Sequence, residues 1–238
     1  MNNASMNQFA AAVSSLDMSR SRFKRPFRHL TTFDAGKLIP IYWDEILPGD
    51  TVTMDVGSLV RMSTPLFPVM DNAYLDIHAY FVPNRLIWSD WETFMGANKT
   101  TYWTVPTVPT PPNSNWQPGN QLLSEGTSVA DYMGLPIHVG AGAKAKVSAL
   151  PFRAYALVWN DWYRDENVMQ PCSITLTGGT LSSPFGHVTS FTYADYVKTT
   201  GAGSYVTRGE YGDFPLPVCK LHDYFTSCLP APQKASQI

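Results

Sequence analysis

The feature that most constrains this fold is an alternation of apolar and polar side chains with a period of two residues. It is clearest in residues 74–82, where the apolar positions are Leu75, Ile77, Ala79 and Phe81. The same alternation runs through residues 52–62, and residues 37–43 have an extended, β-rich composition. Because successive side chains of a strand point to opposite faces, these three stretches predict strands that each bury one face.

Long excursions, instead of tight hairpins, separate the expected strands. Residues 104–120 contain five prolines and no charge, which predicts an extended, polyproline-like loop. Residues 172–217 are rich in Gly, Ser, Thr and Tyr, and we expect an exposed β-loop insertion there. A regular alternation of strands and helices is absent, so the sequence predicts an all-β fold that is decorated with loops and short helices.

The longest expected helix covers residues 151–164 and begins at Pro151. Its aromatic residues recur three or four positions apart: Phe152, Tyr155, Trp159 and Trp162. Residues at this spacing share one helix face, so we expect all four rings to pack in the core.

Two shorter helical turns are also expected. Ser89 and Glu92 have the spacing of a capping box, and Gly96 is placed to end that helix. A second small capped turn of helix is expected over residues 128–134, which begin with Ser128.

The composition favours surfaces that other protein covers. Only 15% of the residues are charged, against roughly 25% in an average soluble domain, and 13% are aromatic. Few charges and many aromatic rings are typical of the centre of protein–protein interfaces. We therefore expect the long loops to contact copies of the same chain. The tryptophans predicted to lie in such subunit interfaces are Trp88, Trp91, Trp103 and Trp116.

A basic arm, residues 1–30, is expected to precede the main body, residues 31–238. Its cations are Arg20, Arg22, Lys24, Arg25 and Arg28. Five cations within nine residues can neutralise phosphates without reading base sequence, and Phe23 and Phe27 can stack on unpaired bases. The arm is therefore a candidate site for single-stranded nucleic acid. Two alternatives are a solvated tail and cations that pair with the acidic body of a neighbouring subunit.

Motifs for catalysis, cofactors and metals are weak. Residues 140–145 match GxGxxA, but they lack the strand and helix that dinucleotide binding requires. Cys219, His222 and Cys228 do not have the usual spacing of a zinc site. No GxSxG motif is present, and no apolar run approaches the roughly 18 residues of a membrane span. We therefore expect no enzyme activity, no cofactor, no metal and no membrane span.

Several blocks along the chain resemble, in order, the major capsid protein of gokushovirus-type microviruses. They are TTFDAGKLIP at 31–40, LPGDT at 47–51, RMSTPLFPVMDNAYLD at 61–76, FVPNRLIW at 81–88, FMG at 94–96, LPFRAY at 150–155, WYRD at 162–165, HDYFTS at 222–227 and PQK at 232–234. The order of these blocks, which run through nearly the whole chain, makes the resemblance specific.

The resemblance implies a viral jelly roll, an antiparallel β-barrel or sandwich, with long loop and short-helix insertions. It implies pentamers that assemble into a T=1 icosahedral shell around single-stranded DNA of a bacteriophage, together with other virion or scaffolding proteins. The arm would face the packaged genome, and particles would assemble in the cytoplasm of the bacterial host. Members of this family run further, so we expect this chain to carry the N-terminal part of an incomplete barrel. From the residues, a jelly-roll carbohydrate-binding module is the alternative function.

Overall fold

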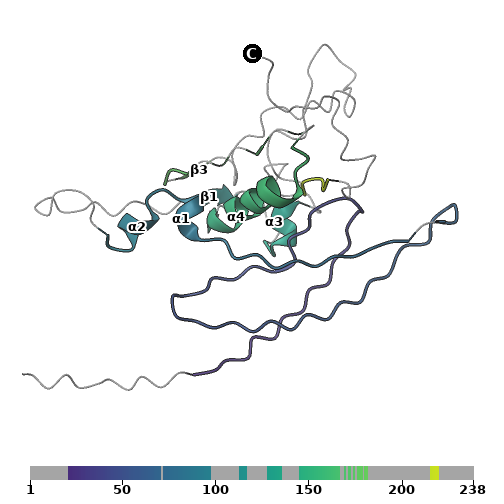
Figure 1. Ribbon diagram of the computed structural model, residues 1–238, viewed down its shortest axis with the longest axis horizontal. Helices are drawn as coiled ribbons and strands as arrows, with labels where there is room; N and C mark the ends of the chain where they lie inside the picture. Colours follow the sequence, from purple (N-terminus) through teal and green to yellow (C-terminus); the bar gives the residue numbers. More distant parts are fainter. Residues whose placement is uncertain are drawn as a thin grey trace, which may run out of the picture. The chain divides into compact units, whose positions relative to one another are not determined.

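The computed structural model describes residues 21–70, 72–97, 113–116, 128–135, 145–166, 169, 171–172, 174, 176–178, 180–181 and 215–219. The chain divides after Leu30 into two units, which are described separately. The elements of the second unit are α1 (Asn84–Ile87), α2 (Trp91–Phe94), β1 (Asn113–Trp116), α3 (Val129–Tyr132), β2 (Ala145–Ser148), α4 (Leu150–Val158), the π-helical turn η2 (Trp159–Tyr163) and β3 (Thr180–Leu181) (Figure 1).

Within the described residues, the three strands form one small sheet in the order β2-β1-β3. Strand β1 runs antiparallel to β2, with Asn113 opposite Ser148, and parallel to β3, with Asn113 opposite Thr180. Strand β1 falls inside residues 104–120, for which the sequence predicts a loop. That prediction is wrong for residues 113–116, because β2 and β3 supply hydrogen-bonding partners; residues 104–112 and 117–120 lie outside the described residues.

Helix α4 begins with Pro151 in its first turn, where the missing N–H of proline leaves no helical hydrogen bond unmade. The helix continues into η2, where the Arg164 N–H donates to the Trp159 carbonyl, an i→i+5 bond. Three rings of the predicted stripe, Phe152, Tyr155 and Trp159, are buried.

The prediction that Trp162 continues this buried stripe is wrong, because its side chain is 67% exposed. A π turn spreads one extra residue over each turn, so each residue advances less far around the helix axis. Tyr163, four residues after Trp159, therefore comes closest to the position that Trp162 would take in a regular α-helix, and Trp162 turns outward.

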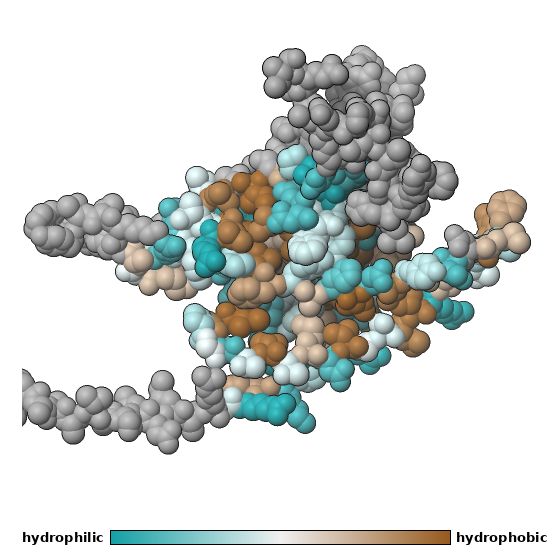
Figure 2. Space-filling view, viewed as in Figure 1, coloured by the Kyte–Doolittle hydropathy of each residue, from teal (hydrophilic) through white to brown (hydrophobic). Residues whose placement is uncertain are grey.

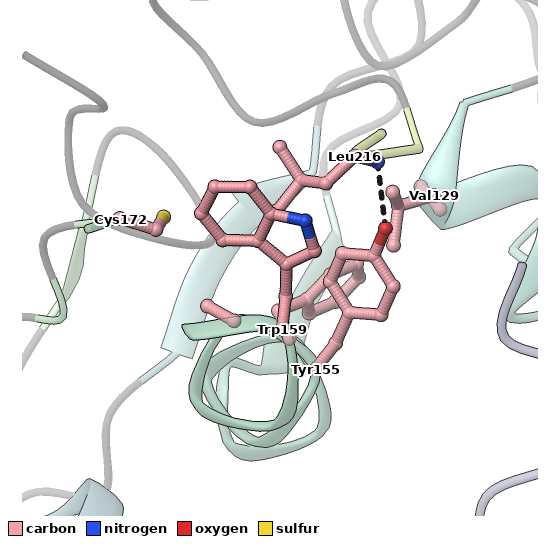
Figure 3. Close-up of a cluster of buried hydrophobic side chains, with 8 residues drawn as sticks. Val129, Tyr155, Trp159, Cys172 and Leu216 are labelled. Atoms are coloured by element: carbon pink, nitrogen blue, oxygen red, sulfur yellow. Dashed lines mark hydrogen bonds between the residues drawn. The ribbon is translucent and has the colours of Figure 1, made fainter. Parts of the chain in front are cut away.

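The core forms where α3 and α4 meet residues from distant parts of the chain. Its buried members are Val129, Ala130, Phe152, Tyr155, Ala156, Trp159, Cys172 and Leu216. Tyr155 of α4 and Trp159 of η2 point toward Leu216, and Val129 approaches from α3 (Figure 3). Cys172 and Leu216 lie at the two ends of residues 172–217, so the expectation of an exposed insertion is wrong for these ends.

Polar atoms of the buried rings connect this core to two other segments. The Tyr155 hydroxyl donates to the Leu38 carbonyl at 3.0 Å and accepts from the Leu216 N–H at 2.8 Å. The Trp159 indole N–H donates to the Pro217 carbonyl at 2.7 Å. Residues 36–38 and 216–218 also bond to each other through their backbones, around an isolated antiparallel bridge between Lys37 and Pro217. The rings thus hold together residues that are more than 100 positions apart.

A buried arginine joins the first turn of α4 to two further segments. One Arg153 nitrogen donates to the Ile87 carbonyl of α1, and another donates to the Thr177 carbonyl, both at 2.9 Å. Burial lowers the pKa of this guanidinium, although both bonds favour its charged form.

The segments expected to be strands, 37–43, 52–62 and 74–82, run as extended chain (Figure 1). Within the described residues, only Lys37 of these segments takes part in a β-bridge. Their apolar positions are open: Val52, Met54, Val56, Val60 and Met62 are 51–59% exposed. Figure 2 shows such apolar patches in brown along these segments. The strand prediction fails in this structure because a ladder requires a paired neighbour, which the described residues do not supply.

Of the three local signals expected at the ends of the short helices, two act as predicted. The Ser128 hydroxyl accepts from the Asp131 N–H at 3.2 Å, and Gly96, with a φ of +99°, follows the last turn of α2. Both predictions are confirmed. The capping box at Ser89 is wrong, because its hydroxyl and N–H both donate to the Leu176 carbonyl instead.

In the described part of the chain, no helix has the length and apolar character needed to cross a membrane.

Replacing Tyr155 by Phe should lower the free energy of unfolding by about 2 kcal/mol, because a half-buried carbonyl and a buried N–H lose their partner. Urea unfolding followed by tryptophan fluorescence measures this change. Tyr74→Phe is the matched control: Tyr74 is 77% exposed, and its change should stay within about 0.5 kcal/mol. Equal unfolding midpoints for the two variants would contradict the bridging role of Tyr155.

Burial raises the pKa of the Cys172 thiol from 9.0 to about 12. At about pH 8.5, iodoacetamide should therefore modify Cys172 slowly in the folded protein and rapidly in urea, because the thiolate is the reactive form. Cys219, which is half-buried, is the internal comparison. Equal modification rates in folded and unfolded protein would refute the burial of Cys172.

The same shift in the pKa of the Cys172 thiol means that the free energy of unfolding falls as the pH rises from 9 toward 12, since only the unfolded thiol ionises there.

Candidate nucleic-acid and subunit interfaces

The basic arm presents its predicted residues to solvent. Those described, all exposed, are Arg22, Phe23, Lys24, Arg25, Phe27 and Arg28. Phe23 is 79% exposed and Phe27 is 58% exposed. No acidic residue occurs from 21 to 30, so the positive charge of this stretch is not offset along the chain. Arg20 lies outside the described residues.

Residues 21–30 have no helical structure, in agreement with Pro26, which disfavours a continuous helix there. The Phe27 ring stacks on the His29 ring, with centroids 6.0 Å apart and planes 11° apart. Exposed cations and a presented aromatic ring are the two elements that single-strand binding surfaces combine. The local geometry of the arm therefore suits contact with phosphates and unpaired bases.

Two of the predicted interface tryptophans, Trp88 and Trp91, contact each other in one aromatic cluster. Trp88 is only 1% exposed and packs against Trp91 and Phe94, with ring centroids 6.0 and 5.1 Å away. Its own chain covers it, so it offers little area to a neighbouring subunit. Trp91 is half-buried in the same cluster. Trp103 lies outside the described residues, and Trp116 is the last residue of β1.

A second aromatic cluster lies at the C-terminal end of α4, and sequence reasoning did not identify it. Tyr80 packs on Trp162, with centroids 5.6 Å apart, and contacts Tyr163 edge to face at 6.1 Å. His78 stacks on Tyr163 at 6.1 Å. Trp162 is 67% exposed and Tyr80 is 38% exposed, and His78 is exposed as well, so three of the four residues present area to solvent. We call these four residues the aromatic platform.

Hydrogen bonds fix the geometry of the aromatic platform. The Tyr80 hydroxyl donates to the Tyr163 oxygen at 2.9 Å, and the Tyr163 oxygen lies 2.6 Å from His78 Nδ1. Burial raises the pKa of the Tyr163 hydroxyl well above its ordinary range, with smaller contributions from Tyr80 and Asp76. Tyr163 therefore stays protonated and can donate to His78 while it accepts from Tyr80.

The platform reverses the expected orientation of residues 74–82. His78 and Tyr80 belong to the polar parity, yet they contact η2. Leu75, Ile77 and Phe81, on the apolar parity, are 45%, 39% and 77% exposed. Trp162 and Tyr163 follow Trp159 by three and four residues, and both spacings place a residue on the same helix face as Trp159. The sequence alone therefore did not show which of the two is exposed.

The described residues contain no group of three or more His, Cys, Asp or Glu side chains that could hold a metal ion. What they do present is an exposed basic arm, open apolar faces on extended segments and an aromatic platform. These are features of contact surfaces for macromolecules.

Comparison with known proteins identifies the class to which such surfaces belong. Residues 11–238 match the family described as capsid protein (F protein). The match covers nearly the whole chain, and this chain therefore belongs to that family of capsid proteins.

Three curated relatives carry the name capsid protein VP1. The chain is 36% identical to that of Bdellovibrio phage phiMH2K, over 96% of its own length and 36% of the relative. It is 34% identical to that of Spiroplasma virus 4, over 91% of the chain and 35% of the relative. It is 34% identical to that of Chlamydia phage 1, over 98% and 36%. The chain thus spans about a third of the length of these relatives.

Proposed function

We propose that this chain is part of the major capsid protein of a bacteriophage and that it assembles with copies of itself into the shell of the virion. The observation that carries the proposal is the match to the capsid family over residues 11–238. Exposed apolar faces support it. When a neighbouring subunit covers side chains such as Val52 and Met62, the contact is stabilised by about 25 cal/mol for each Å² of apolar surface removed from water.

We infer a jelly roll for the complete protein, with pentamers and a T=1 icosahedral shell as its assembly. Residues 52–62 and 74–82 keep the period of two that a half-buried strand requires, and their apolar faces are open to a second layer. Partner strands from elsewhere would complete the ladders and cover these faces. Such closure removes exposed edges, which are a source of uncontrolled aggregation.

Assembly is tested most directly on the complete gene product. Size-exclusion chromatography and negative-stain electron microscopy should show pentamers or closed particles. The alternative function, a carbohydrate-binding module, predicts a stable monomer that binds glycans through exposed rings such as Trp162. Glycan binding by a monomer, with no assembly at any concentration, would reject the capsid proposal.

The basic arm is proposed to contact packaged single-stranded DNA inside the shell, with assembly in the cytoplasm of the bacterial host and with other virion or scaffolding proteins as further partners. Its exposed cations and its two exposed phenylalanines support this role. Cations of this kind bind phosphates without sequence preference, which suits a genome that is packaged whole.

Replacing Arg20, Arg22, Lys24, Arg25 and Arg28 by Ala should weaken binding to an oligo(dT) strand and flatten its salt dependence. For single strands, the slope of log K against log salt concentration changes by roughly 0.7 per phosphate contact, so five contacts correspond to about 3.5. Fluorescence anisotropy at several salt concentrations measures both quantities.

Two matched variants separate charge from stacking. Replacing the four arginines by Lys should preserve the salt slope, because the charges remain. Replacing Phe23 and Phe27 by Ala should lower affinity at an unchanged slope, because stacking is not ionic. An unchanged slope in the five-alanine variant, with unchanged DNA content in particles, would refute the proposed role of the arm.

A further inference from the structure

We propose that Phe27 and His29 of the basic arm hold one unpaired base of single-stranded DNA between their rings. The inference rests on the proposed function, since it names a site through which the arm contacts bases. It adds His29, which the sequence pattern did not single out, to the residues of that site. The observation that carries it is the geometry of this ring pair, with planes 11° apart and centroids 6.0 Å apart.

The two sides of the arm differ in chemistry. Residues 21–30 have no helical structure and run as an extended trace (Figure 1). In an extended chain, residues two positions apart point to the same side. From 22 to 29, the even positions carry Pro26 and the cations Arg22, Lys24 and Arg28. The odd positions carry flat side chains: Phe23, Arg25, Phe27 and His29. One side therefore suits phosphates, and the other suits the faces of bases, on which aromatic rings and guanidinium planes stack.

The spacing of the odd positions suits the thickness of a base. Two residues of an extended chain advance roughly 6.6 Å. An inserted base needs rings about 6.8 Å apart, twice the roughly 3.4 Å rise of stacked bases. The centroids of Phe27 and His29 are already 6.0 Å apart, and their planes are nearly parallel, so small side-chain rotations open the site. Two rings then contact both faces of one base, whereas an isolated ring contacts only one.

The surroundings of the ring pair favour a nucleotide over an acidic protein segment. Arg25 and Arg28 are exposed close to Phe27 in the sequence, and no acidic residue occurs from 21 to 30. Phe27 itself is 58% exposed. An acidic peptide would pair with the cations only, whereas a nucleotide brings both a phosphate and a flat ring. The base must be unpaired, because stacking between protein rings requires bases that are splayed out of a helix.

One polar atom of the ring pair has no partner. The His29 side chain is half-buried, its Nε2 is buried, and no residue in the described part of the chain forms a hydrogen bond with that atom. A buried polar atom in this state costs free energy. A nucleotide carries phosphate oxygens and base-edge groups, which can pair with an imidazole nitrogen as donor or as acceptor.

Two strands of equal length and charge test the ring pair on the full chain. One is oligo(dT), and the other is an abasic strand, which keeps the phosphates and lacks the bases. Fluorescence anisotropy should show that the wild-type chain binds oligo(dT) at least about tenfold more tightly. His29→Ala should weaken binding to oligo(dT) about tenfold, as loss of a stacked aromatic side chain does, and should leave binding to the abasic strand unchanged.

Matched variants separate the flat ring from side-chain size. His29→Phe should retain the preference for oligo(dT), because a flat ring remains, whereas His29→Leu should lose it. Leu30→Ala is the control: Leu30 is 80% exposed and follows His29 on the other side of the arm, so both affinities should stay unchanged. None of these residues belongs to the core around α3 and α4, so the body should stay folded in every variant.

An equal loss on both strands in His29→Ala would overturn the inference, because His29 would then act through charge or local structure. Unchanged binding to both strands would overturn it as well. In either case, an altered salt slope in the five-alanine variant would still support the proposed role of the arm. If the wild-type chain bound neither strand, that proposed role would fail, and this inference would fail with it.

Discussion

The structure depends on pairing the polar atoms of two buried rings, Tyr155 of α4 and Trp159 of η2. Tyr155 and Trp159 stabilise the core through their apolar area, but burial of an unpaired hydroxyl or indole N–H would cost much of that gain. Leu38, Leu216 and Pro217 supply the missing partners from segments far apart in the chain. The same bonds therefore fix where the chain before α1 and the chain after β3 must lie.

This constraint decides which surfaces remain for other partners. With α4 packed against α3 and residues 215–219, the polar parity of residues 74–82 contacts η2, and its apolar parity is left open. The apolar positions of residues 52–62 are open as well. A chain that has few charges and leaves alternating apolar faces exposed is suited to lie against other protein, which agrees with its membership of a capsid family.

Local signals predicted local structure well. Pro151 begins α4, Ser128 caps α3 and Gly96 follows the end of α2, because each effect acts within one helical turn. Ser89 was predicted wrongly because a distant carbonyl, that of Leu176, competes for its hydroxyl. In the candidate sites, the exposed cations of the arm could be predicted from their spacing alone. The burial of Trp88 and the exposure of Trp162 could not be predicted, because both depend on neighbours distant in sequence.

The sequence by itself determined the family, the helix that organises the core and the basic character of the arm. These follow from residue identity and from spacings of a few positions. Only the tertiary structure decided which side of residues 74–82 contacts η2, that Tyr163 and not Trp162 packs against the core, and that the aromatic platform exists. The physical reason is that strand pairing, a π turn and ring contacts all depend on partners that the local order of residues does not specify.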